Sequence, residues 1–170
     1  MALIKPGEVK GATACKNGEL VRFDLGGPVL AIALDLLSEH HLRTYLVLES
    51  AMHDVPPFSV VPLDCDHLCF SYGGGWVLEM AADGQSFPGN PDGADTVGEI
   101  RIHDAGVTSI IVNVLDAKMN AKVALLDLAT YTPVKHDRRH GARIQSWKIW
   151  AKEEERLRVG GRPIVTFPAQ

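Results

Sequence analysis

The residues of this chain that could do acid or base chemistry are histidines next to carboxylates. Glu39 precedes two successive histidines, and His103 is followed by Asp104. An imidazole beside a carboxylate can act as a general acid or base near neutral pH. The alternative interpretation is that these are polar residues at the boundaries of surface elements. The candidate catalytic residues are His40, His41, Glu49 and His103.

A second candidate site is a basic segment in the last quarter of the chain. It gathers four Lys or Arg residues and two histidines within nine positions. Guanidinium groups bind phosphate and carboxylate with paired hydrogen bonds, and histidines make such binding depend on pH. Without interleaved aromatic residues or a glycine-rich cradle, the segment predicts a contact for a small anion or a protein, not for nucleic acid. A solvated turn is the alternative. The residues are Lys135, His136, Arg138, Arg139, His140 and Arg143.

The cysteines Cys65 and Cys69 are predicted to be free thiols. The chain has three cysteines, and this odd number argues against a disulfide framework. In a single strand, Cys65 and Cys69 would have Cα atoms about 13 Å apart, which is beyond the reach of a disulfide. The segment around them holds residue types that bind zinc, but no second ligand pair accompanies it. We therefore expect neither a metal site nor a cofactor.

Several motifs of common enzymes are missing. The chain has no P-loop, no Gly-x-Ser-x-Gly elbow, no His-Glu-x-x-His and no Gly-x-Gly-x-x-Gly after a strand. Their absence removes the commonest nucleotide-binding, esterase and protease interpretations. An enzyme whose site is assembled across loops stays open, so the sequence leaves enzymatic activity undecided and favours a non-catalytic role.

The elements that must position these residues have mainly β patterns. Residues 97–151 contain short apolar runs rich in Ile and Val, and a pleated strand repeats its faces every two residues. We predict one β-rich domain, a sandwich or flattened barrel of about eight strands with one or two short helices. Residues 28–42 and 117–129 fit a helical stripe as well as a strand, so an α+β fold with helices there is the alternative.

Other segments are assigned from their turn residues. Apolar runs at 67–72 and 76–80 flank three glycines and predict a β-hairpin. Residues 19–24, 43–49 and 164–167 are predicted strands, and 152–158 a helical turn. Residues 83–95 are rich in Gly, Pro and Asp, which is typical of a loop or linker.

A short internal similarity indicates two related units. Gly18-Glu19-Leu20 and Gly98-Glu99-Ile100 lie 80 residues apart, and apolar runs follow both. We interpret this as a duplication, with β-units at about 8–82 and 96–170 joined by the 83–95 segment. A chance match is the alternative.

Composition describes an ordinary globular chain. It has 170 residues, 46% apolar and 22% charged, and its net charge of −4 disfavours broad nucleic-acid binding. The first residues do not resemble a secretory signal, and no apolar run is long enough to cross a bilayer, so we expect a cytoplasmic protein that does not enter membranes.

The expected function is binding. We predict a homo-oligomeric binding or interaction module that contacts an anion or a protein partner through loops 83–95 and 135–143. Trp150 is expected at the subunit interface, because large aromatic residues are favoured anchors there. The alternative is a small hydrolase or isomerase that uses a His–carboxylate pair.

Overall fold

The computed structural model describes residues 7–37, 43–63, 67–81, 85–86, 96–103, 106–115, 121–134 and 142–168. The fold is mainly β, as predicted, with strands β1 to β14 arranged in two sheets and no closed barrel among these residues. The number of strands exceeds the predicted eight because Glu8–Gly11, Ser59–Pro62 and Gln85–Ser86, which were not predicted as strands, also form short strands. No helix in the described ranges is long and apolar enough to span a membrane.

The larger sheet contains eleven strands, in the order β1-β6-β2-β3-β4-β5-β10-β9-β12-β8, with β11 also paired to β10. In chain order its strands are β1 (Glu8–Gly11), β2 (Leu20–Asp24), β3 (Pro28–Leu37), β4 (Arg43–Ser50), β5 (Ser59–Pro62), β6 (Leu68–Gly73), β8 (Gln85–Ser86), β9 (Ile100–Ile102), β10 (Thr108–Leu115), β11 (Ala121–Asp127) and β12 (Ala142–Ile144). The turn η1 (Ala12–Ala14) follows β1.

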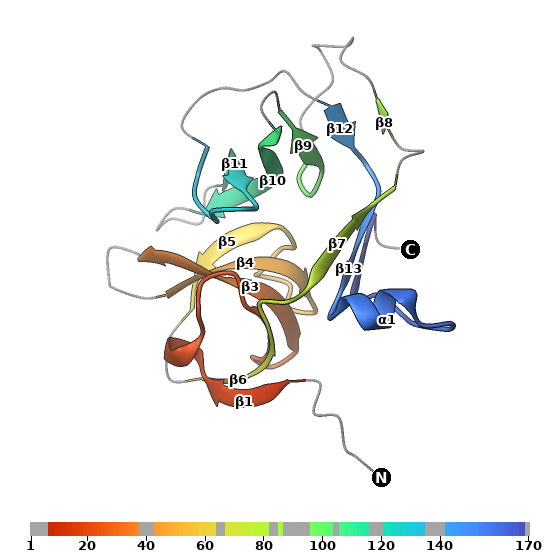
Figure 1. Cartoon of the computed structure of the whole chain (residues 1–170). Helices are drawn as coiled ribbons and strands as arrows, with labels where there is room; N and C mark the ends of the chain where they lie inside the picture. Colours follow the sequence, from red (N-terminus) through yellow and green to blue (C-terminus); the bar gives the residue numbers. More distant parts are fainter. Residues whose placement is uncertain are drawn as a thin grey trace.

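The smaller sheet has the order β14-β13-β7 and contains β7 (Val77–Met80), β13 (Trp147–Trp150) and β14 (Val165–Phe167). The helix α1 (Glu153–Leu157) follows β13, and Figure 1 shows it beside the β7–β13 pair. The predicted helical turn and closing strand are thus confirmed.

The α+β alternative is wrong, because the described parts of both ambiguous segments form strands, β3 over Pro28–Leu37 and β11 over Ala121–Asp127. β3 is apolar on both faces: Leu30 and Ile32 enter one apolar cluster, while Val29 and Ala31 enter another. A strand buried on both sides reads as a continuous apolar run, which periodicity cannot separate from a helix. β11 pairs with β10 from Ala121 to Asp127.

The predicted hairpin around the three glycines is also wrong. Both flanking runs are strands, but β6 pairs with β1 and β2 while β7 pairs with β13. Gly73 has a φ of 85°, a left-handed conformation that favours glycine. The glycines therefore carry the chain from the larger sheet to the smaller one.

The first cluster of the core lies between the two sheets. It joins residues of β2, β3 and β4 to the buried Trp147 and Ile149 of β13 and to Val165 of β14. The second cluster covers the other face of β2, β3 and β4. Burial on both faces fixes these three strands, which provide the rigid wall of the site described below.

The two matched Gly-Glu pairs have matching surroundings. Trp76 Nε1 donates to Gly18 O over 2.8 Å, and Trp147 Nε1 donates to Gly98 O over 2.8 Å. Both glycines have a positive φ, 79° and 94°. β7 begins directly after Trp76, and β13 begins at Trp147. These two strands pair with one another. The duplication of one unit stays a prediction, as does the division into one or two units.

Candidate ligand pocket between the sheets

A pocket of about 600 Å³ lies between the larger sheet and β14. Its walls come from β2, β3, β4, the segment before β5, β6 and the last strand, β14. Ligand pockets commonly measure about 300–1,000 Å³ and are mostly apolar with a few polar groups. Size and lining therefore identify this pocket as the candidate functional site.

Aromatic packing shapes one side of the pocket. Phe58 and Phe167 line it, and their rings contact edge to face with centroids 5.3 Å apart. Behind them Trp147 stacks on Phe167 with centroids 5.4 Å apart and meets Phe58 at 5.8 Å. Gly98 fits against this cluster, since a Cβ at that position would lie 2.6 Å from Phe167. The aromatic wall is therefore held by the buried indole of Trp147.

Two charged residues stand on the wall formed by the larger sheet. Arg22 of β2 is opposite Leu30 of β3, and Leu30 is opposite Glu49 of β4. Directly opposed residues share a face, so a guanidinium and a carboxylate flank an apolar side chain. Burial raises the pKa of Glu49, and the charge of Arg22 opposes that rise. The wall can thus meet both an apolar group and a charged one.

The candidate catalytic residues do not assemble at this pocket. Glu49 lines it, but among the described residues no histidine does. His103 is 4% exposed, and its Nε2 lies 2.7 Å from Ser109 Oγ. His40 and His41 lie outside the described residues. The expected His–carboxylate pair is therefore not assembled in this pocket by the residues that the structure describes.

Most of the predicted anion site lies outside the described residues, namely Lys135, His136, Arg138, Arg139 and His140. Arg143 is described and binds the buried Glu99, with Nε 3.0 Å and Nη2 2.5 Å from Oε2. Gln145 Nε2 donates to the other carboxylate oxygen over 3.2 Å. This contact joins the start of β9 to β12 and gives Arg143 a structural role. Of the predicted loop 83–95, the structure describes residues 85–86, which form β8 and pair with β12.

Trp150 lies inside the fold. It is 7% exposed, and its Nε1 donates to Glu79 Oε2 over 2.7 Å. Covered by its own chain, the indole leaves little surface for a second subunit. Self-association stays a prediction, but Trp150 is not exposed enough to serve as the expected anchor of a subunit interface.

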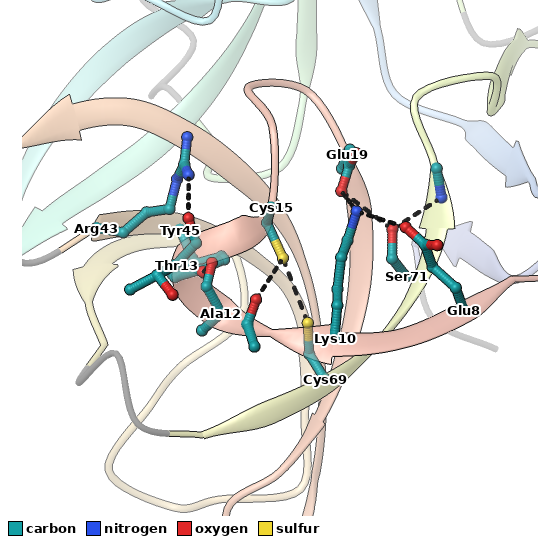
Figure 2. A network of polar contacts seen from close by, with 12 residues as sticks. Glu8, Lys10, Ala12, Thr13, Cys15, Glu19, Arg43, Tyr45, Cys69 and Ser71 are labelled. Carbon is teal, nitrogen blue, oxygen red and sulfur yellow. Dashed lines mark hydrogen bonds and ion pairs between the residues drawn. The ribbon is translucent and has the colours of Figure 1, made fainter.

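A buried polar network lies on the other side of the larger sheet (Figure 2). The Sγ atoms of Cys15 and Cys69 are 3.3 Å apart, and both described cysteines are free thiols, as predicted for Cys69. The hydrogen bond from Cys69 lowers the pKa of Cys15 to about 7 and raises that of its partner. Sequence spacing considered Cys65 as the neighbour of Cys69 and did not identify Cys15. β1 and η1 place Cys15 next to β6. Among the described residues no three potential ligands are grouped closely enough to hold a metal ion.

The same network contains a buried carboxylate whose ionisation should govern stability in acid. Lys10 Nζ lies 2.6 Å from Glu19 Oε2, and Ser71 Oγ donates to that oxygen over 3.1 Å. Burial raises the pKa of Glu19, but these contacts outweigh burial and leave it below its usual value. A carboxyl with a lowered pKa stabilises the fold above its unfolded pKa, and this contribution is lost as pH falls through the folded pKa.

We therefore expect Glu19→Gln to lower the free energy of unfolding by about 1–3 kcal/mol at neutral pH. The difference from the parent protein should shrink below a pH of about 4, where the unfolded carboxyl is protonated. Urea titrations between pH 3 and pH 7 measure this directly. A difference that stays constant over that range would contradict the assignment.

Sequence reasoning did not identify the pocket residues Arg22 and Tyr72, nor the residues of and before β14 that line the pocket. They come from strands far apart in the chain, and no local motif marks them. A scan against protein-family models found no matching family, and searches of curated proteins and of solved structures found no match either.

Proposed function

We propose that this protein is a non-catalytic binding module whose ligand occupies the pocket between the larger sheet and β14. The supporting observation is an apolar-walled pocket of about 600 Å³ with Arg22 and Glu49 on one wall. Such a pocket favours a ligand with an apolar body and at least one charged group. The alternative, a hydrolase or isomerase, gains no support from the described residues, because no histidine among them joins Glu49 in the pocket.

The proposal is tested with anilinonaphthalene sulfonate, a dye with an apolar body and one negative charge. We expect its fluorescence to rise saturably on binding to the folded protein. Ala51 is exposed at the pocket, so Ala51→Trp should block entry and weaken dye binding at least tenfold. Val123→Trp, on the exposed part of β11, is the matched control and should bind the dye like the parent protein. Equal dye affinity in all three proteins would reject the pocket as the binding site.

A homo-oligomeric state and a cytoplasmic location stay predictions that accompany this proposal. Sedimentation at tens of micromolar tests the first. A monodisperse monomer would remove self-association without affecting the pocket.

A further inference from the structure

We propose that Cys15 and Cys69 form a redox-active dithiol, which a hydroperoxide converts reversibly into a disulfide. The site is separate from the ligand pocket, because both cysteines belong to the second apolar cluster, on the other face of the larger sheet. The distance between the two sulfur atoms, the place of each cysteine in the fold and the groups around Cys15 support this assignment.

The two sulfur atoms are already in contact. They lie 3.3 Å apart, and Figure 2 shows the two side chains pointing toward each other. A disulfide has a length of about 2.05 Å, so its formation requires the sulfur atoms to approach by about 1.2 Å. A movement of that size is within the reach of side-chain torsions, so the folded chain can form the bond.

Backbone pairing holds the two cysteines in place. Cys69 lies in β6, where it is opposite Lys10 of β1. The turn η1 then redirects the chain: Ala12 N donates to His67 O over 3.0 Å, and Cys15 N donates to Ala12 O over 3.1 Å. The two cysteines are 54 positions apart in the sequence, so their contact is a property of the folded state.

Cys15 is the thiol that we expect to react first. The hydrogen bond from Cys69 lowers the pKa of Cys15 to about 7 against the opposing effect of burial, and the positive charge of Lys10 acts in the same direction as the hydrogen bond. The same hydrogen bond raises the pKa of Cys69. Because the thiolate is the nucleophilic form of cysteine, Cys15 attacks the oxidant and Cys69 resolves the product.

Cys15 is buried beneath a short surface turn. The residue is 2% exposed, but Ala14 before it and Lys16 after it are exposed. A short turn at the surface opens at a lower free energy than a strand in the core. Hydrogen peroxide is a small molecule, so a local opening of η1 is enough to admit it.

The oxidation is a two-electron reaction in two steps. The Cys15 thiolate attacks one oxygen of the peroxide, the O–O bond breaks, and the sulfur becomes a sulfenic acid while the released hydroxide takes up a proton to form water. The Cys69 sulfur then attacks the Cys15 sulfur, and the sulfenic hydroxyl leaves with the Cys69 proton as a second water. Two thiols are thus oxidised to one disulfide, and one peroxide is reduced to two waters. An external dithiol reverses the change by thiol–disulfide exchange.

The test uses the full chain with Cys65→Ser, which leaves Cys15 and Cys69 as its only thiols. The reduced protein is treated with hydrogen peroxide at neutral pH, then unfolded in guanidinium chloride, alkylated with iodoacetamide and weighed by mass spectrometry. We expect a monomer that has lost two hydrogens and takes up no alkyl group. Dithiothreitol should restore both thiols.

Two variants in the same background separate the roles of the thiols. With Cys69→Ala, the oxidation should stop at a sulfenic acid on Cys15, which dimedone traps. With Cys15→Ala, the remaining thiol should react with peroxide about tenfold more slowly than the dithiol protein, because it lacks a lowered pKa. An equal rate would overturn the assignment of Cys15 as the nucleophile.

The dithiol protein unfolded in guanidinium chloride before peroxide is added serves as the control for the fold. Dimedone should trap most of its oxidised Cys15, because nothing holds Cys69 nearby, whereas in the folded protein the disulfide should form first. Two results would overturn the proposal. One is a folded protein whose two thiols both remain open to alkylation after a peroxide treatment that oxidises the unfolded chain. The other is a disulfide yield no higher in the folded protein than in the unfolded one.

Discussion

Replacing Glu99 with alanine should lower the free energy of unfolding by about 3–5 kcal/mol, because the change removes the buried carboxylate that accepts two hydrogen bonds from the Arg143 guanidinium. The side chains of Glu99 and Arg143 are only 4% and 15% exposed. The same carboxylate accepts a hydrogen bond from Gln145, so its loss strips two donors at once. Guanidinium chloride unfolding followed by tryptophan fluorescence measures the change.

Two substitutions serve as controls for Glu99. Glu99→Gln keeps an acceptor for the guanidinium and should lose less than the alanine variant. Glu153→Ala removes the partner of Arg156 in an exposed helical ion pair, where solvent screening should make the loss clearly smaller than that of Glu99→Ala. If Glu99→Ala were no more destabilising than Glu153→Ala, the contact between β9 and β12 would not be a stabilising one.

The mainly β class was predictable because strand periodicity is a local property. Short apolar runs bounded by turn residues predict β2, β4 and β14. β3 remained ambiguous because Val29 and Leu30 are both buried, on opposite faces, so the alternation that identifies a strand is absent. Resolving it required knowledge of what covers each face, which is a tertiary property.

Pairing was harder to predict than strand existence. The glycine tract after β6 looked like a hairpin turn, yet β7 finds its partner in β13, about 70 residues further along. A strand can pair with its neighbour in sequence or with any other strand that offers a complementary partner. Here β7 pairs with the distant β13 and not with β6. The burial of Trp150 was hard to predict for the same reason, because the sequence of β13 does not show which other elements cover this side chain.

The candidate site could be predicted only in part. Glu49 was singled out as a possible partner of histidines near it in sequence, and the structure places it instead beside Leu30 and opposite β14. Arg22 carries no motif and was not singled out. A pocket built from strands far apart in the chain exists only once the sheets are packed, so residue spacing alone could not have identified its walls.

Trp147→Ala should be the most damaging substitution near the pocket, lowering the free energy of unfolding by about 3–5 kcal/mol. The indole is 1% exposed, stacks on Phe167, contacts Phe58 and donates to Gly98 O. Its loss opens a cavity directly behind two residues that line the pocket. We therefore expect weaker dye binding together with the loss of stability.

Trp76 provides the matched control, because its Nε1 makes the equivalent bond to Gly18 O while its ring is only partly buried. Trp76→Ala should therefore lose less stability than Trp147→Ala and should leave dye affinity unchanged, since Trp76 does not line the pocket. Trp147→Phe, which keeps an aromatic ring but removes the donor, should fall between the parent protein and Trp147→Ala in stability. If Trp147→Ala bound the dye as tightly as Trp76→Ala, the indole would support the core without shaping the pocket, and the aromatic wall would have to be held by Phe58 and Phe167 alone.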